Sequence, residues 1–191
     1  MLEEFHIEPL QNRRTLIIGE VGSGKSYLTS MLLWEAFSKL SKKDITILDF
    51  APHKKLLNGL LVGGQLDDVI PLGPDCIYYK SKAIRAPRLE GLNKQNVREL
   101  AERNAQYTTK FIRMFLSSPT PYLFINDLTM HLHAGSIKLL NEAIQKSGAF
   151  IASAYSGSIL IQDHGSGISK RERELLDIVI SIMDVLIDLS P

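Results

Sequence analysis

Eight consecutive residues near the N-terminus restrict the fold of this chain more than any other feature. They read GEVGSGKS at positions 19–26 and match the pattern G-x-x-x-x-G-K-[S/T] without substitution. An apolar run at 16–18 precedes them and predicts a buried strand, and residues 27–40 have the spacing of a helix. A strand, a glycine-rich turn and a helix in this order predict a phosphate-binding loop (P-loop) in an α/β fold.

The residue types in this loop suit a nucleoside triphosphate. Gly22 and Gly24 allow the backbone to turn so that its N–H groups point at one anion, and the following helix adds its unpaired N-terminal donors. Lys25 can reach the β- and γ-phosphates, and the Ser26 hydroxyl suits Mg²⁺. We therefore expect ATP and Mg²⁺ as cofactors. The predicted binding residues are Gly19, Glu20, Val21, Gly22, Ser23, Gly24, Lys25, Ser26 and Tyr27.

Length and composition fit a cytoplasmic protein of ordinary type. The 191 residues predict a single domain over 1–191, and the net charge of +1 gives no argument for nucleic acid or an anionic membrane. The single cysteine, Cys76, excludes an internal disulfide and fits a reducing cytoplasm. The longest apolar stretch, near 178–189, is interrupted by Asp184 and Asp188 and is too short to span a bilayer.

Apolar patterning predicts the remaining elements. Strands are expected at 45–48, 76–79, 122–125 and 149–152, and helices from Asn93 to about 116, from 135 or 136 to 147, and over a short stretch opening at 169–172. Less regular segments are predicted as a short edge strand at 5–8, a loop with a short helix at 53–70, and one or two strands at 177–189. Strand, helix, strand order predicts a three-layer α/β sandwich with a mainly parallel central sheet.

A P-loop requires an acidic partner, and two strand ends offer one. Asp49 follows the strand at 45–48, and Asp127 follows Asn126 at the end of the strand at 122–125. Such a carboxylate orients Mg²⁺ or its water. The alternative interpretation of Asn126-Asp127 is a turn favoured by propensity alone. The metal candidates are therefore Ser26, Asp49 and Asp127, and which aspartate serves decides the subclass.

If Asp127 serves, a strand lies between the P-loop strand and the next strand in sequence. That arrangement resembles the RecA-like ATPases, which have an additional catalytic acid. In that group the strand usually ends in Asp-Glu, the first residue for the metal and the second for the attacking water. Here Asn126 and Asp127 take these places, so the pattern is met in part. Asn126 can hydrogen-bond a metal-bound water but brings no negative charge.

Two shorter segments resemble the FtsK and HerA family of ring ATPases. Residues 49–52 resemble a segment after its second strand, and residues 150–155 resemble its sensor strand. The resemblance implies that Ser153 reads the γ-phosphate, although Ala154 stands where that family commonly has glutamine. It also implies a homo-oligomer, and by resemblance alone nucleic acid as a partner.

Four arginines and two histidines are candidates for further roles. In a ring ATPase a neighbouring subunit often inserts an arginine at the γ-phosphate. The candidates are Arg85, Arg88, Arg171 and Arg173, although a solvated surface position is favoured for each. His131 and His133 follow the Asn-Asp pair without zinc-ligand spacing, which predicts surface residues or neighbours of the site.

The leading hypothesis is a Mg²⁺-dependent ATPase in which the catalytic candidates are Lys25, Asn126, Asp127 and Ser153. An alternative is a small-molecule kinase that uses Asp49 near the acceptor and residues 85–88 as a lid. A third hypothesis is a nucleotide-gated binding module without turnover, because Asn126 weakens the metal site.

Overall fold

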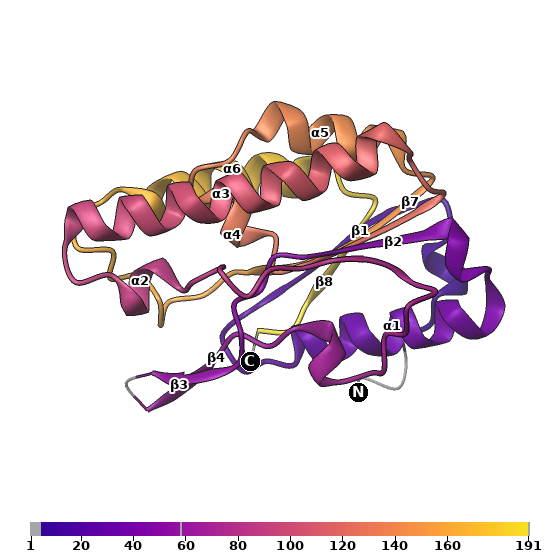
Figure 1. Ribbon diagram of the computed structural model, residues 1–191, viewed down its shortest axis with the longest axis horizontal. Coiled ribbons are helices and arrows are strands. Elements are labelled where there is room, and N and C mark those ends of the chain that lie inside the picture. Colours follow the sequence, from indigo (N-terminus) through magenta and orange to yellow (C-terminus); the bar gives the residue numbers. More distant parts are fainter. Residues whose placement is uncertain (1–4, 58, 191) are drawn as a thin grey trace.

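A six-stranded parallel sheet forms the centre of the molecule (Figure 1). The computed structural model describes residues 5–57 and 59–190. The strands lie in the order β5 (Ile77–Tyr79), β2 (Ile45–Asp49), β6 (Tyr122–Asn126), β7 (Ala149–Tyr155), β1 (Arg14–Gly19) and β8 (Val185–Asp188). Every neighbouring pair in this sheet is parallel, so the carboxyl ends of all six strands lie at one edge.

Helices cover both faces of the sheet (Figure 1). One face carries α1 (Lys25–Lys39), and the other carries α3 (Lys94–Ser117), α5 (Ile137–Lys146) and α6 (Ile168–Ser181). Side chains of β1 alternate between the two cores: Ile17 packs with α1, whereas Leu16 and Ile18 pack on the opposite side. The predicted three-layer α/β sandwich with a parallel central sheet is therefore confirmed.

The strand order places the P-loop strand away from its successor in sequence. Two strands, β7 and β6, lie between β1 and β2. This order brings the ends of β6 and β7 next to the loop that follows β1. A strand between β1 and β2 is expected if Asp127 is the acidic partner, and the structure has two strands there.

Most predicted elements are confirmed within one or two residues, and Asn93 caps α3 by accepting a hydrogen bond from Asn96 N at 2.9 Å. The edge strand predicted at 5–8 is wrong. A short 3-10 turn spans Glu8–Leu10 instead, because Pro9 fixes its own backbone and cannot donate to a strand. Two further 3-10 turns span Lys42–Asp44 and Leu66–Asp68, and two short helices are α2 (Pro87–Glu90) and α4 (Thr129–Leu132).

The loop and short helix predicted at 53–70 are also mostly wrong, because an antiparallel hairpin of β3 (Lys55–Leu57) and β4 (Leu60–Val62) occupies the first part. Gly63 has a left-handed φ of 73°, and a Cβ there would lie 2.5 Å from the carbonyl oxygen of Pro52. This glycine therefore forms the turn that returns the hairpin to the sheet edge.

The C-terminal strands predicted at 177–189 are half wrong. Helix α6 begins at Ile168, after Gly167, and runs to Ser181, so only β8 is a strand, and it pairs with β1. Leu176 and Val179 are buried at helical spacing, and this burial outweighs the β-branched composition of the segment. Among the described residues, no helix has the length and apolar character needed to cross a bilayer.

Candidate functional site

The loop between β1 and α1 has the backbone geometry that its glycines permit. Gly19, Gly22 and Gly24 have φ angles of 151°, 77° and 94°. A Cβ at Gly22 would meet nothing within 4 Å, whereas one at Gly19 would lie 2.7 Å from Ser23 Oγ. Helix α1 starts at Lys25 without a side-chain cap, so its first N–H groups face the loop. The loop is therefore open at Gly22, and the N–H groups at the start of α1 are placed to bind a phosphate group.

The side chain of Lys25 contacts this loop. Its Nζ donates to the carbonyl oxygens of Gly19 at 2.8 Å and Glu20 at 2.5 Å. Burial lowers the pKa of the Lys25 ammonium, while the carboxylates of Asp127 and Glu20 act in the opposite direction. The ammonium is therefore held at the loop, where a phosphate oxygen would find a partly desolvated cation.

Three segments that are distant in sequence meet at the carboxyl ends of the strands. The hydroxyl of Ser26 donates to Asn126 Oδ1 at 3.2 Å, and the hydroxyl of Ser153 donates to the same oxygen at 3.1 Å. The backbone N–H of Asp127 donates to Ser153 Oγ at 3.0 Å. One hydrogen-bonded unit thus joins Ser26 of the P-loop, Asn126 and Asp127 at the end of β6, and Ser153 on β7.

Asp127 occupies the position next to Lys25 in this unit. Its backbone has a left-handed φ of 55°, which is uncommon outside glycine, and its carboxylate accepts a hydrogen bond from Thr129 Oγ1. Burial raises the pKa of Asp127, although Thr129 and Lys25 oppose the shift. A carboxyl group with a raised pKa that lines a cavity suits proton acceptance.

Asp49, the other acidic candidate, is enclosed. Its carboxylate accepts hydrogen bonds from Ala51 N (3.2 Å), Asn126 Nδ2 (2.8 Å), Leu66 N (2.7 Å) and the Tyr78 hydroxyl (2.8 Å). Burial nevertheless raises the pKa of Asp49 to about 6. Because protein donors surround both oxygens, Asp49 holds Asn126 in place and does not reach the cavity described next.

A cavity of about 280 Å³ connects the P-loop with these strand ends. The predicted site residues that line it are Val21, Gly22, Gly24, Lys25, Ser26, Tyr27, Asp127 and Ser153. The pair Ser26 and Asp127 offers a hydroxyl and a carboxylate, the oxygen ligands that Mg²⁺ prefers. The residues present therefore fit a magnesium nucleotide.

Several residues at this cavity were not assigned to it from the sequence. Arg88, for which a solvated position was favoured, is buried and lines the cavity, so that expectation is wrong. Tyr155 lines it as well, and the Tyr155 hydroxyl accepts a hydrogen bond from Leu160 N at 2.8 Å. Arg85 is exposed, and Arg171 donates to the carbonyl oxygens of Leu132 and Gly135. No local sequence pattern predicts that Arg88 and Tyr155 line the same cavity, because the two residues lie far apart in the chain.

Both histidines after Asp127 are buried, so the predicted surface position is wrong for each. His131 bonds the hydroxyl of Thr108 at 2.7 Å and the carbonyl oxygen of Ser136 at 3.2 Å. His133 bonds Glu172 through Nε2, which makes it a neighbour of the site as the sequence also suggested.

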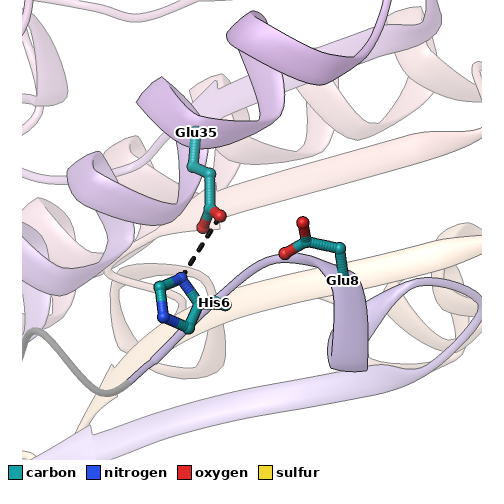
Figure 2. A group of neighbouring side chains, drawn as sticks. All are labelled: His6, Glu8 and Glu35. Atoms are coloured by element: carbon teal, nitrogen blue, oxygen red, sulfur yellow. Dashed lines mark hydrogen bonds and ion pairs between the residues drawn. The ribbon is translucent and has the colours of Figure 1, made fainter.

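A separate cluster of possible metal ligands lies at the other end of α1, where His6, Glu8 and Glu35 converge (Figure 2). Lys39 already supplies a positive charge to both carboxylates there, with Nζ 2.6 Å from Glu35 Oε1. The Ile7 N–H also donates to Glu35 at 2.9 Å. The cluster therefore fastens the N-terminal segment to α1.

Similarity to known proteins adds little to this picture. No family model matches the chain, and no curated protein matches it. Among solved structures, the Pif1 helicase of Candida albicans is 13% identical over 94% of this chain and 36% of that chain, with a TM-score of 0.38. The helicase domain of Hef from Pyrococcus furiosus is 12% identical over 96% of this chain and 36% of that chain, with a TM-score of 0.44. The chain thus spans little more than a third of the length of either.

Proposed function

We propose that this chain binds Mg²⁺–ATP at residues 19–27 and hydrolyses it to ADP and phosphate. The observation that carries the proposal is the convergence of Lys25 and Ser26 with Asp127 and Ser153 at one cavity. A structural turn needs no such meeting, because nothing in a strand-to-helix connection requires a cation, a hydroxyl and a carboxylate from separate strands.

The residues divide the chemistry among them. Lys25 and the N–H groups of the loop stabilise negative charge on the β- and γ-phosphates. Ser26, with Asn126 behind it, is placed to hold Mg²⁺, which would neutralise phosphate charge when bound. Asp127 orients a water molecule and accepts its proton while the water oxygen bonds the γ-phosphorus and the bond to the ADP oxygen breaks. Ser153 fixes the backbone of Asp127.

Among the residues that the structure describes, no contact favours the kinase alternative. It requires Asp49 at the acceptor, yet four donors surround that carboxylate. It also requires a movable lid at 85–88, yet Arg88 is buried. The binding module without turnover differs from the ATPase in one measurable quantity, which is the rate of phosphate release.

Two substitutions test the proposal. Lys25→Ala should remove most ATP binding, because the loop loses its cation, and Asp127→Asn should retain binding while kcat falls at least about a hundredfold. Phosphate release and equilibrium binding would measure these effects, with EDTA to remove Mg²⁺. Matched controls are Lys43→Ala and Asp44→Asn, because both residues are exposed and distant from the cavity. Undiminished hydrolysis in Asp127→Asn would remove that residue from the mechanism.

The resemblance of residues 49–52 and 150–155 to the FtsK and HerA family extends the proposal to assembly. We infer that the chain acts as a homo-oligomer and that nucleic acid is the substrate on which such a motor would work. The net charge of +1 provides no independent support for nucleic acid, so this part rests on the resemblance.

A further inference from the structure

Arg88 is the second cation of the cavity. It lies in α2, is only 8% exposed and lines the same cavity as Lys25. Its guanidinium is 5.0 Å from the centre of the Tyr155 ring, and Lys25 Nζ is 5.9 Å from the centre of the same ring. Arg88 therefore faces the P-loop of its own chain and is too enclosed to reach into the site of a neighbour.

Glu172 holds this guanidinium in a fixed orientation. The two terminal nitrogens of Arg88 donate to the two oxygens of Glu172, each at 3.0 Å. The Glu172 carboxylate also bonds Nε2 of the buried His133, so it is anchored from behind. Glu172 comes from α6 and His133 from the segment after α4, so three separate elements fix one arginine.

The pairing leaves Arg88 with donors to spare. A guanidinium has five N–H donors, and the two bonds to Glu172 use two of them. Planar guanidinium groups bind carboxylates and phosphates through paired hydrogen bonds in the plane of the group. One edge of the Arg88 guanidinium can therefore hold Glu172 while another edge contacts an anion. Burial of both partners also limits screening by water.

We propose that Arg88 contacts the γ-phosphate of ATP bound in the same chain, with Glu172 as its positioning residue. This inference rests on the proposed ATPase function and deepens it. Arg88 stabilises the charge that develops on the γ-phosphate oxygens during attack by water, a role that ring ATPases often assign to a neighbouring subunit. Each chain then carries its own arginine, and ADP, which lacks the γ-phosphate, does not engage it.

The first test compares ATP with ADP. Arg88→Gln should weaken binding of a non-hydrolysable ATP analogue at least tenfold and lower kcat about a hundredfold or more, while ADP affinity stays within twofold. The matched control is Arg85→Gln, because Arg85 lies three residues away, is exposed and does not line the cavity. An unchanged ratio of ATP-analogue to ADP affinity together with unchanged kcat in Arg88→Gln would overturn the proposal.

Removal of one partner from a buried ion pair can unfold a protein, so two further variants are needed. Arg88→Lys keeps the charge but loses the paired geometry, and Arg88→Gln with Glu172→Gln leaves no unpaired charge. ADP binding reports that each variant is folded. Both variants should lose affinity for the ATP analogue and keep their affinity for ADP. Glu172→Gln alone should have the same effect, because Arg88 is then misoriented. A normal preference for the ATP analogue in these folded variants contradicts the inference.

An experiment in which two inactive variants are mixed distinguishes an arginine that acts in its own chain from one that a neighbouring chain supplies. Lys25→Ala retains Arg88 but has a defective loop, and Arg88→Gln retains the loop. If Arg88 acts within its own chain, mixtures of the two inactive variants remain inactive. Recovery of ATP hydrolysis in the mixture would show that a neighbour supplies the arginine and would reject this proposal. A wild-type chain that neither binds nor hydrolyses ATP would instead reject the proposed function itself.

Discussion

Asn126 shows at the scale of one residue why this site departs from the usual Asp-Glu strand end. Its Nδ2 donates to Asp49 Oδ1 at 2.8 Å and to the carbonyl oxygen of Gly64 at 3.0 Å, while its Oδ1 accepts from Ser26 and Ser153. Only an amide both donates and accepts in this way. A buried carboxylate at Asp49 therefore explains why an aspartate would not fit at 126.

Asn126→Asp should consequently damage the site rather than improve it. The substitution removes both donated hydrogen bonds and places a second carboxylate against Asp49 in the core, so the free energy of unfolding should fall by about 2–4 kcal/mol. Urea unfolding measures this loss. Asn96→Asp is the matched control, because a carboxylate in the first turn of α3 is well placed and the change should be near zero. Increased stability or faster hydrolysis in Asn126→Asp would contradict this explanation.

His131 should make stability depend on pH. Burial lowers the pKa of His131 from 6.5 to about 4, because a charged ring would be desolvated, and the nearby charge of Arg171 acts in the same direction, while the hydrogen bond to the Ser136 carbonyl opposes the shift. A lowered pKa in the folded state means that the stabilisation is complete above pH 6.5 and is lost as the pH falls toward 4. Relative to His131→Gln, the wild-type chain should lose up to about 3 kcal/mol between pH 7 and pH 4. Urea unfolding at each pH measures this loss. If the free energy of unfolding changes with pH by the same amount in both proteins, the predicted role of His131 is refuted.

Single residues also mark the limit of sequence-based prediction. The P-loop pattern indicates Lys25 and Ser26 because their spacing within the loop is fixed, and Asp127 is indicated separately by its place at the end of an apolar strand. The pairing of Arg88 with Glu172 could not be predicted, since 84 residues separate the partners and neither belongs to a motif. Such pairs depend on how α2 and α6 pack, which local patterns do not encode.

At the scale of elements, signals at helix ends were more informative than the composition of helix interiors. Asn93 was expected to cap a long helix, and its side chain does so. The segment 177–181, by contrast, is rich in β-branched residues and was predicted as a strand, yet it completes α6. Capping depends on neighbours in sequence, whereas the end of α6 depends on packing against the sheet.

The cap of α3 can be tested directly. Asn93→Ala removes the acceptor for Asn96 N, so the free energy of unfolding should fall by about 1 kcal/mol, whereas Asn93→Ser should cost only a few tenths because serine also caps. Chemical denaturation of the three proteins provides the comparison. An equal loss in both variants would mean that the side-chain cap contributes nothing specific.

At the scale of the whole molecule, strand alternation with helices was sufficient to predict the layers. Neither composition nor length indicates assembly, so the predicted homo-oligomer remains a prediction. In the presence of Mg²⁺–ATP, we expect the mass in solution to be at least twice the 21.4 kDa of one chain. Light scattering with and without nucleotide measures this mass, and Lys25→Ala serves as the control that cannot respond to ATP. A strict monomer under both conditions would argue strongly against a ring motor.

The sheet order has a consequence for synthesis of the chain. The P-loop strand β1 is made early, but its neighbours β7 and β8 comprise residues 149–155 and 185–188. On the ribosome, β1 therefore remains an apolar strand with both edges unpaired until β7 has emerged, a condition that favours contact with chaperones. β1 is thus translated before every other strand of the sheet but gains both of its neighbours only after residue 188 is made.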